Sequence, residues 1–560
     1  MTRVCFAFLI AAACTSIARA AGAPVPDTPP AGIEPAGMPL SQVLKAYDAA
    51  AGALLPGVAN TRVEHWTYTD AGLKGSETLV RSGQDYYARV LEGAYVEEFG
   101  RFIGKGWHRD RNGVVSEMSS IDYGSLAMLV FVQGLHDAQD PKNDAKVLGQ
   151  VAAPCVCYVV SVKYPGDRHP EYVYYDKSSG LVDRTEHVID DTKITTDYAD
   201  YRTTKGLVEP WHVHVSTGDA LRDTDFQRAD ATLGVSVDPV QFAPPHSTYG
   251  FASYSGALTL PIKVLWDDNF LKFDGQSAYS VYRAPNVVVR MVINGRGLDF
   301  ALACGKARSY IDWDVAQQLG LTSQNQNIRD KNGDPISFET LIPQASIGGL
   351  TLSNFAVRAV PFHYHLGNET KIVGVLGYDL LSSGVFTVDF VNEKLTLAPA
   401  AQFDGPIVDP KALVLPLTFD DGLPYTVTAI SGHPSTRMLV DNDFDYSVIF
   451  GSFLDRYPDA VQDVNGKAHA DATLPFADAH SYGSDAQVWQ AVLPRFDFAG
   501  AHFLNFRMIA DSDNAAADDT DAVVGGDVLR FYDMTFDYAH ARVILKPNAW
   551  FYKVYKVEPQ

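Results

Sequence analysis

The sequence contains little cysteine, little positive charge and no long apolar stretch. Five cysteines in 560 residues are too few for a scaffold stapled by disulfides. Beyond the N-terminus, no stretch supplies the roughly 18 uninterrupted apolar residues of a transmembrane helix, so we predict no membrane span. Lys and Arg number 45 against 67 Asp and Glu, a formal net charge of −22. Because nucleic-acid binding needs clustered positive charge, this balance argues against a nucleic-acid partner.

The N-terminus has the three-part layout of a cleaved signal peptide. A basic residue precedes the apolar run Val4 to Ala13, and the small residues Ala18 and Ala20 precede the expected cleavage point. We therefore predict a signal peptide over residues 1–20 and a periplasmic or secreted protein. The alternative is a lipobox that ends in Cys14, which would give a lipid anchor. That alternative is weaker because the usual leucine is missing.

The composition and periodicity of the next 225 residues predict a linker, a helix and a β domain. Segment 21–40 is rich in Pro, Ala and Gly, which predicts a flexible linker. Ser41 is expected to cap an Ala-rich helix that runs through Ala51 and ends at Gly52. Short runs of alternating apolar and polar residues follow, which predicts an antiparallel β domain over 41–245.

The second half contains an internal repeat. Val375 to Asp379 matches Val523 to Asp527, and Leu258 to Ile262 recurs as Leu413 to Leu417. Other matched pairs are Thr387 and Thr535, Asp389 and Asp537, Asn354 and Asn505, and the dipeptides Asn332-Gly333 and Asn465-Gly466. The repeat predicts two homologous lobes, over residues 250–400 and 410–552.

Each lobe carries an apolar strand, a sharp turn, a serine, a hairpin and an apolar-apolar-Gly strand in the same order. In this order the lobes resemble the retropepsin and pepsin family of aspartic proteases, in which each lobe contributes one Asp-Thr-Gly turn. The resemblance implies a mainly β fold with a bilobal pair of acid-protease-like barrels and a peptide-binding cleft between them. It also implies that Gly377 and Gly525 lie directly beneath the two turns.

The two turns depart from the family pattern. The first reads Leu302-Ala303-Cys304-Gly305, so Ala303 stands where the resemblance places the first catalytic aspartate. The second keeps its aspartate as Asp441, but Asp443 replaces the turn glycine. Because the family mechanism needs two carboxylates that share one proton, Asp441 is the one candidate catalytic residue and lacks its partner. We therefore expect a pseudoprotease.

Other reactive side chains have plainer explanations. Cys304 could be a nucleophile, but no nearby motif supplies a histidine base, so we expect a small buried substitute. Cys155 and Cys157 lie two apart on a predicted strand, near the upper Cα separation for a disulfide, so we expect thiols. The remaining candidates are the acidic run Asp441, Asp443 and Asp445 and the pairs His212 with His214 and His363 with His365. None completes a calcium or zinc site, and we predict no metal and no cofactor.

The β domain has a second, weaker resemblance. Asp200-Tyr201-Arg202, followed by Gly206 and Pro210 before the strand at Trp211, is similar to the last strands of lipoprotein-carrier proteins. That resemblance implies a half-barrel, a curved antiparallel sheet wrapped around a helix, with an apolar groove for acyl chains or hydrophobic peptides. The aromatic residues of the domain are equally explained as core.

Three functions follow from these features. The leading hypothesis is binding of a peptide or protein in the interlobe cleft without cleavage. One alternative is an active or weakly active aspartic-type endopeptidase that uses Asp441 with a second, unrecognised acid. Another is a lipid or lipoprotein carrier that works through the half-barrel.

Overall fold

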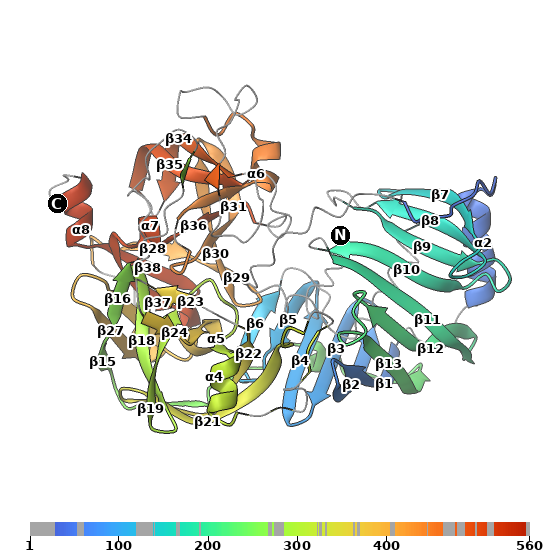
Figure 1. Cartoon of the computed structure of the whole chain (residues 1–560), viewed down its shortest axis with the longest axis horizontal. Helices are drawn as coiled ribbons and strands as arrows, with labels where there is room; N and C mark the ends of the chain where they lie inside the picture. Colours follow the sequence, from blue (N-terminus) through green and yellow to red (C-terminus); the bar gives the residue numbers. More distant parts are fainter. Residues whose placement is uncertain are drawn as a thin grey trace.

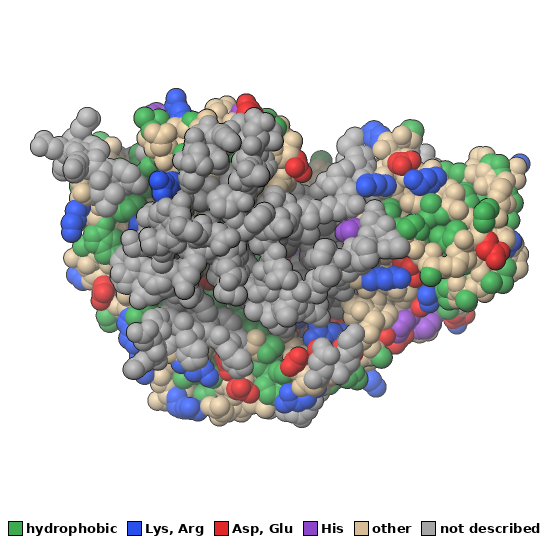
Figure 2. Space-filling model, turned by 45° about the horizontal axis from the view of Figure 1, so that its top comes forward, with side chains coloured by type: hydrophobic (Ala, Val, Ile, Leu, Met, Phe, Trp, Pro, Cys, Tyr) green, Lys and Arg blue, Asp and Glu red, His purple; other side chains and the backbone are tan. Residues whose placement is uncertain are grey.

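The computed structural model describes residues 29–52, 61–118, 138, 141–163, 169–189, 192–266, 272–273, 285–321, 323, 328–330, 333–361, 364–366, 370–403, 409–444, 446–462, 477–478, 488–498, 501–511 and 520–555. The fold is mainly β, as predicted, and Figure 1 shows a curved sheet beside two stacked lobes. Among the described residues, no helix combines the length and apolar character needed to cross a membrane. Basic and acidic side chains are interspersed over the curved sheet in Figure 2.

The N-terminal domain is an antiparallel sheet of 13 strands with one helix against it. In sheet order the strands are β6 (Val115–Met118), β5 (Lys105–Arg109), β4 (Tyr95–Phe102), β3 (Asp85–Glu92), β2 (Leu73–Ser82), β1 (Thr61–Asp70), β13 (Thr224–Leu233), β12 (Leu207–Ser216), β11 (Thr192–Thr204), β10 (Val182–Ile189), β9 (Glu171–Asp176), β8 (Cys157–Lys163) and β7 (Asp144–Val151). Helix α2 (Leu40–Ala51) buries Val43 and Tyr47 in the core of this sheet. The predicted half-barrel is therefore present, and the 3-10 helix η1 (Pro239–Phe242) follows it.

Three local expectations about this domain need correction. Helix α2 begins at Leu40 after Pro39, so Ser41 lies inside the helix and is not its cap. The predicted linker is partly ordered, because the amide of Glu34 donates to the Gln150 carbonyl in β7 at 2.9 Å. The expected thiols Cys155 and Cys157 instead form a disulfide. Cys155 lies in a bend before β8, which reduces their Cα separation to 5.3 Å.

Lobe 1 and lobe 2 each contain a sheet with the same path. In order, the described strands of lobe 1 are β14 (Ala252–Ser253), β22 (Leu350–Val360), β20 (Tyr310–Asp312), β25 (Gly374–Leu376), β19 (Arg296–Leu302), β18 (Pro285–Ile293) and β16 (Lys263–Trp266), with β21 (Phe338–Ile347) beside β18 and β22. Those of lobe 2 are β33 (Ala477–Asp478), β34 (Val488–Phe498), β35 (Ala501–Asp511), β32 (Val448–Phe450), β36 (Ala522–Val524), β31 (His433–Val440), β30 (Leu423–Ile430) and β29 (Thr418–Asp420), extended by β17 (Lys272–Phe273). Short elements complete the lobes: β23 (Tyr364–Leu366), β24 (Thr370–Ile372), α4 (Trp313–Gln318), α5 (Tyr378–Leu381), α6 (Gly451–Arg456), α7 (Gly526–Leu529), α8 (Ala549–Tyr555), η3 (Ala400–Phe403) and η7 (Tyr538–His540).

A third sheet joins the lobes and contains three strands from each. Its order is β15 (Leu258–Pro261), β27 (Lys394–Ala398), β26 (Val385–Asp389), β37 (Tyr532–Asp537), β38 (Arg542–Pro547) and β28 (Leu413–Pro416). At its centre the repeated residues Thr387 and Thr535 are register partners, and their hydroxyl oxygens lie 2.9 Å apart. The positions that match in sequence therefore meet at a pseudo-two-fold axis, and the predicted repeat is a structural one. Asn332, Asn465 and Gly466 lie outside the described residues.

Candidate functional site

Each lobe presents its turn in the same way. The strand before the turn runs parallel to the apolar-apolar-Gly strand, with Leu302 paired to Leu376 in lobe 1 and Val440 paired to Val524 in lobe 2. The next amide closes the turn: the N–H of Ala303 donates to Leu376 at 3.0 Å, and the N–H of Asp441 donates to Val524 at 3.1 Å. Ala303 and Asp441 therefore occupy equivalent positions.

Four hydrogen bonds join the two turns across the axis. The Asn442 amide nitrogen donates to the Leu302 carbonyl at 2.7 Å, and its Oδ1 accepts from the Cys304 N–H at 2.8 Å. In return, the Cys304 thiol donates to the Val440 carbonyl at 3.1 Å, and the Asn442 N–H donates to Cys304 Sγ at 3.3 Å. Cys304 is thus more than the small buried filler that we expected, because it helps to hold the lobes together.

The Asp441 carboxylate reaches the opposite turn. A Cβ added to Gly305 would lie 2.1 Å from both Cγ and Oδ2 of Asp441, so only glycine leaves room for this side chain. The charged partner of the carboxylate is Lys306, whose Nζ lies 3.7 Å from Asp441 Oδ2 and 4.0 Å from Asp443 Oδ2. One ammonium group therefore lies between two carboxylates of lobe 2, and lobe 1 contributes no carboxylate at Ala303.

Comparison with known proteins identifies the region around the first turn. Residues 289–380 match the family model described as aspartyl protease. Lobe 1 is aspartic-protease-like. No curated protein is significantly similar to the chain.

Solved structures are similar to different parts of the chain. A LolA superfamily protein from Nitrosomonas europaea is 9% identical, with a TM-score of 0.28, over 37% of this chain and 98% of that one. Basic 7S globulin from soybean is 12% identical, with a TM-score of 0.30, over 52% and 96%. A retropepsin-like aspartic protease from Rickettsia conorii is 15% identical, with a TM-score of 0.16, over 26% and 94%.

Retained and altered residues of the aspartic-protease pattern fit one another. The retained Gly305 in lobe 1 makes room for the retained Asp441. By the pseudo-two-fold relation, Asp443 takes the place of the second turn glycine and faces the turn in which Ala303 carries only a methyl group. The Asp443 carboxylate shares Lys306 with Asp441. Lys306 and Asn442 were not identified from the sequence, because the contacts that reveal them join residues more than 130 positions apart.

The electrostatics of the aspartic-protease-like turns oppose nucleophilic chemistry. Burial, followed by the neighbouring Asp441, raises the pKa of the Cys304 thiol well above its usual value, so the thiol stays neutral and unreactive. Burial lowers the pKa of Lys306, but Asp441 and then Asp443 outweigh that effect, and the net shift is upward. Lys306 therefore stays protonated and cannot act as a base.

A serine, a glycine and an aspartate support each turn from beneath. In lobe 1 the Ser309 hydroxyl donates to Asp379 Oδ1 at 2.6 Å and accepts from the Gly377 N–H at 3.0 Å. In lobe 2 Ser447, Asp527 and Gly525 make the equivalent contacts at 2.7 and 3.0 Å. A Cβ at Gly377 would lie 2.5 Å from the Lys306 carbonyl oxygen, and one at Gly525 would lie 2.7 Å from that of Phe444. The predicted placement of both glycines is confirmed.

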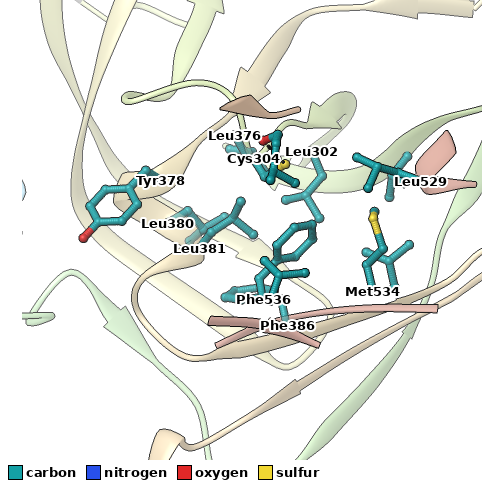
Figure 3. Close-up of a cluster of buried hydrophobic side chains, with 14 of the residues drawn as sticks. Leu302, Cys304, Leu376, Tyr378, Leu380, Leu381, Phe386, Leu529, Met534 and Phe536 are labelled. Atoms are coloured by element: carbon teal, nitrogen blue, oxygen red, sulfur yellow. Dashed lines mark hydrogen bonds between the residues drawn. The ribbon is translucent and has the colours of Figure 1, made fainter. Parts of the chain in front are cut away.

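An apolar layer separates the turns from the interlobe sheet. Figure 3 shows Leu302, Cys304 and Leu376 above Phe386 and Phe536. Phe386 on β26 and Phe536 on β37 are register partners next to the threonine pair. The two lobes therefore share one continuous core, which fixes how their turns face each other.

The half-barrel docks onto both lobes close to the first turn. Glu97 on β4 lies 3.0 Å from Arg308, which comes five residues after Ala303. Asn112, in the turn between β5 and β6, exchanges hydrogen bonds of 2.7 and 2.9 Å with the backbone of Ala356 in lobe 1. On the other side, His108 Nδ1 lies 2.7 Å from Asp421 Oδ1 in the β29–β30 turn of lobe 2. One end of the half-barrel thus bridges the two lobes, as Figure 1 shows for β4, β5 and β6.

The first histidine pair belongs to the half-barrel and not to the aspartic-protease-like site. His212 and His214 lie on β12 in the half-barrel and share one Asp225 oxygen, at 3.2 and 2.9 Å. His363 and Asp445 lie outside the described residues, as does the side chain of His365.

Proposed function

We propose that the C-terminal lobes bind an extended peptide or protein segment in the cleft between them and do not cleave it. The observation that supports this proposal is the Asp441–Lys306 pair, with Nζ and Oδ2 3.7 Å apart, opposite the methyl group of Ala303. Peptide hydrolysis by the aspartic mechanism needs one carboxylate as base and a second as acid. Here both nearby carboxylates, Asp441 and Asp443, come from lobe 2 and share one ammonium group, and lobe 1 offers no carboxylate to complete the acid–base pair.

In this proposal the lobes keep the scaffold for peptide binding although the dyad is lost. The paired turns, the supporting serine–aspartate contacts and the interlobe sheet hold the two lobes together, which supports a cleft like that of the family which the lobes resemble. An extended peptide in such a cleft is recognised mainly by its backbone, and that recognition does not depend on the dyad. In this proposal the protein is exported through residues 1–20 and meets its peptide or protein ligand in the periplasm or outside the cell.

Binding and cleavage are tested together with a fluorescein-labelled pool of decapeptides. Fluorescence anisotropy measures binding, and mass spectrometry of the same samples between about pH 3 and pH 7 measures cleavage. We expect saturable binding of intact peptides. Lys306→Trp, which fills space beside Asp441, should weaken binding at least about tenfold, whereas Lys394→Trp, at the exposed first residue of β27, should not. Absence of binding, or equal binding by both variants, would contradict the proposal.

The two alternatives give different outcomes. Peptide cleavage that disappears in Asp441→Asn would identify an aspartic-type endopeptidase. A lipid or lipoprotein carrier is favoured by one observation, the 13-stranded curved sheet packed on α2. Lipid that co-purifies with the protein, detected by mass spectrometry of an organic extract, would support the carrier function if the peptide pool is not bound.

A further inference from the structure

The turn before β8, in the half-barrel, brings two sulfurs and a carboxylate together. Cys155 is half-buried in a bend, and Cys157, at the start of β8, is fully buried. One sulfur from each cysteine and a carboxylate oxygen of Asp183 all lie within 4.8 Å of one another. The sequence does not reveal this cluster, because Asp183 is on β10, two strands away from β8 in the sheet.

A β-bulge directs Asp183 toward the cysteines. Val182 pairs with Tyr175 and Arg184 pairs with Tyr174, so Asp183 is an extra residue in β10 with no partner on β9. Bulges re-aim side chains and occur next to functional sites. The neighbouring Arg184 forms an ion pair with Asp197, in which Nε lies 2.5 Å from Oδ1. The Asp183 side chain is therefore turned to the Cys-x-Cys turn by the backbone itself.

The surroundings suit a metal site with one open side. Val151, Val159, Tyr172 and Tyr174 form a buried apolar cluster with Cys157. Val156, between the cysteines, is 58% exposed, so solvent reaches the tip of the turn. The buried apolar side chains exclude water, which strengthens the attraction between a cation and its anionic ligands. The exposed tip of the turn gives a metal ion a path from solvent.

We propose that Cys155, Cys157 and Asp183 form a site for a thiophilic divalent cation such as Zn²⁺, which is closed by the disulfide and opened by reduction. Two thiolates and one carboxylate give three ligands, and water takes the fourth tetrahedral position. With Zn–S near 2.3 Å and Zn–O near 2.1 Å, ligand atoms around zinc are roughly 3.5 Å apart. The reduced sulfurs must therefore separate to about this spacing, with the carboxylate oxygen already within 4.8 Å of both.

The chemical balance has two steps. A dithiol or phosphine reductant gives two electrons to the Cys155–Cys157 bond, and each sulfur takes up one proton. A dithiol supplies both protons and becomes a disulfide, whereas with a phosphine one water molecule supplies both protons and the oxygen of the phosphine oxide. Zn²⁺ then binds the two sulfurs and displaces both thiol protons into solvent. Oxidation of the same sulfurs to the disulfide requires release of the ion, so the disulfide and the bound metal exclude each other.

The test uses the whole protein in two forms, oxidised and reduced. The reduced form is prepared with a phosphine, which is then removed. Each form is titrated with Zn²⁺ in competition with a chromogenic chelator. A variant with Cys155→Ser and Cys157→Ser provides the baseline for zinc held by other cysteines. We expect one additional Zn²⁺ per chain in the reduced wild type, none in the oxidised protein, and at least about tenfold weaker binding in Asp183→Asn. Asp176→Asn, opposite Cys157 in the register, is the matched control and should bind as the wild type does.

A second measurement covers the case in which a variant folds poorly. Titration of the reduced wild type with Co²⁺ should give a thiolate-to-cobalt charge-transfer band and the intense visible bands of tetrahedral cobalt. Any of three results would overturn the proposal. They are zinc binding that is the same before and after reduction, no additional zinc in the reduced protein, and unchanged zinc affinity in Asp183→Asn. Weak octahedral cobalt bands would do the same.

Discussion

Replacement of Asn442 by alanine removes the amide that joins the two turns. Asn442 is 2% exposed, and its side chain makes hydrogen bonds of 2.7 Å to Leu302 and 2.8 Å to Cys304. Without it, the Leu302 carbonyl and the Cys304 N–H are left buried and unpaired. Each unpaired group costs about 1–3 kcal/mol, so the free energy of unfolding of the lobes should fall by about 2–6 kcal/mol.

Calorimetry and amide exchange measure this effect. At about 2–4 °C per kcal/mol for a domain of comparable size, the melting temperature of the lobes should fall by roughly 4–24 °C. Amide exchange at Cys304 should accelerate. Thr387→Val is the matched control on the same axis, because it removes one half-buried contact between hydroxyl groups and should cost only about 1 kcal/mol. If Asn442→Ala costs no more than Thr387→Val, the turns are not held together as described.

Two further predictions concern packing and pH. Gly377→Val and Gly525→Val should each destabilise a lobe by about 1–3 kcal/mol or more. The control Gly250→Val should not, because a Cβ at Gly250 would meet nothing within 4 Å. Unchanged melting temperatures in the first two variants would contradict the packing described. Burial, and then the neighbouring Asp379, raises the pKa of Asp110 at the docked end of the half-barrel to about 7, so the folded protein holds this proton more tightly than the unfolded chain. Stability should therefore fall as pH rises from about 4 to about 7, and Asp110→Asn should reduce that fall; thermal unfolding at both pH values measures it, and an unaltered pH dependence would refute it.

The repeat made the lobes predictable from the sequence. The separation between Gly377 and Thr387 in lobe 1 equals that between Gly525 and Thr535 in lobe 2. The two separations agree because the residues occupy equivalent positions in the two lobes. Ala303 and Asp441 were located in the same way, by their place after a strand and before a serine. The order of strand, turn residue and serine along the sequence is therefore enough to locate Ala303 and Asp441.

Other features depend on contacts that the sequence does not encode locally. Lys306 and Asn442 act across the axis, on residues of the other lobe, so their own neighbours in the chain give no signal. The Cys155–Cys157 disulfide depends on a bend where regular strand geometry was assumed. Asp183 reaches the same place through a bulge, which shifts the alternation that a periodic pattern would predict.

The central claim is that the aspartic-protease-like scaffold is intact and only its chemistry is lost. The most direct measurement is acid-dependent cleavage of the decapeptide pool by a variant that restores the turns with Ala303→Asp, Cys304→Thr and Asp443→Gly, together with Lys306→Ala to remove the competing ammonium group. Two aspartates that share a proton should give an acidic, bell-shaped pH profile, while the wild type cleaves nothing. Ala303→Asp alone should do less, because Lys306 and Asp443 remain beside the pair. If the four-fold variant keeps the circular dichroism spectrum of the wild type and still cleaves nothing between about pH 3 and pH 6, the cleft has diverged beyond peptide hydrolysis, and the central claim is contradicted.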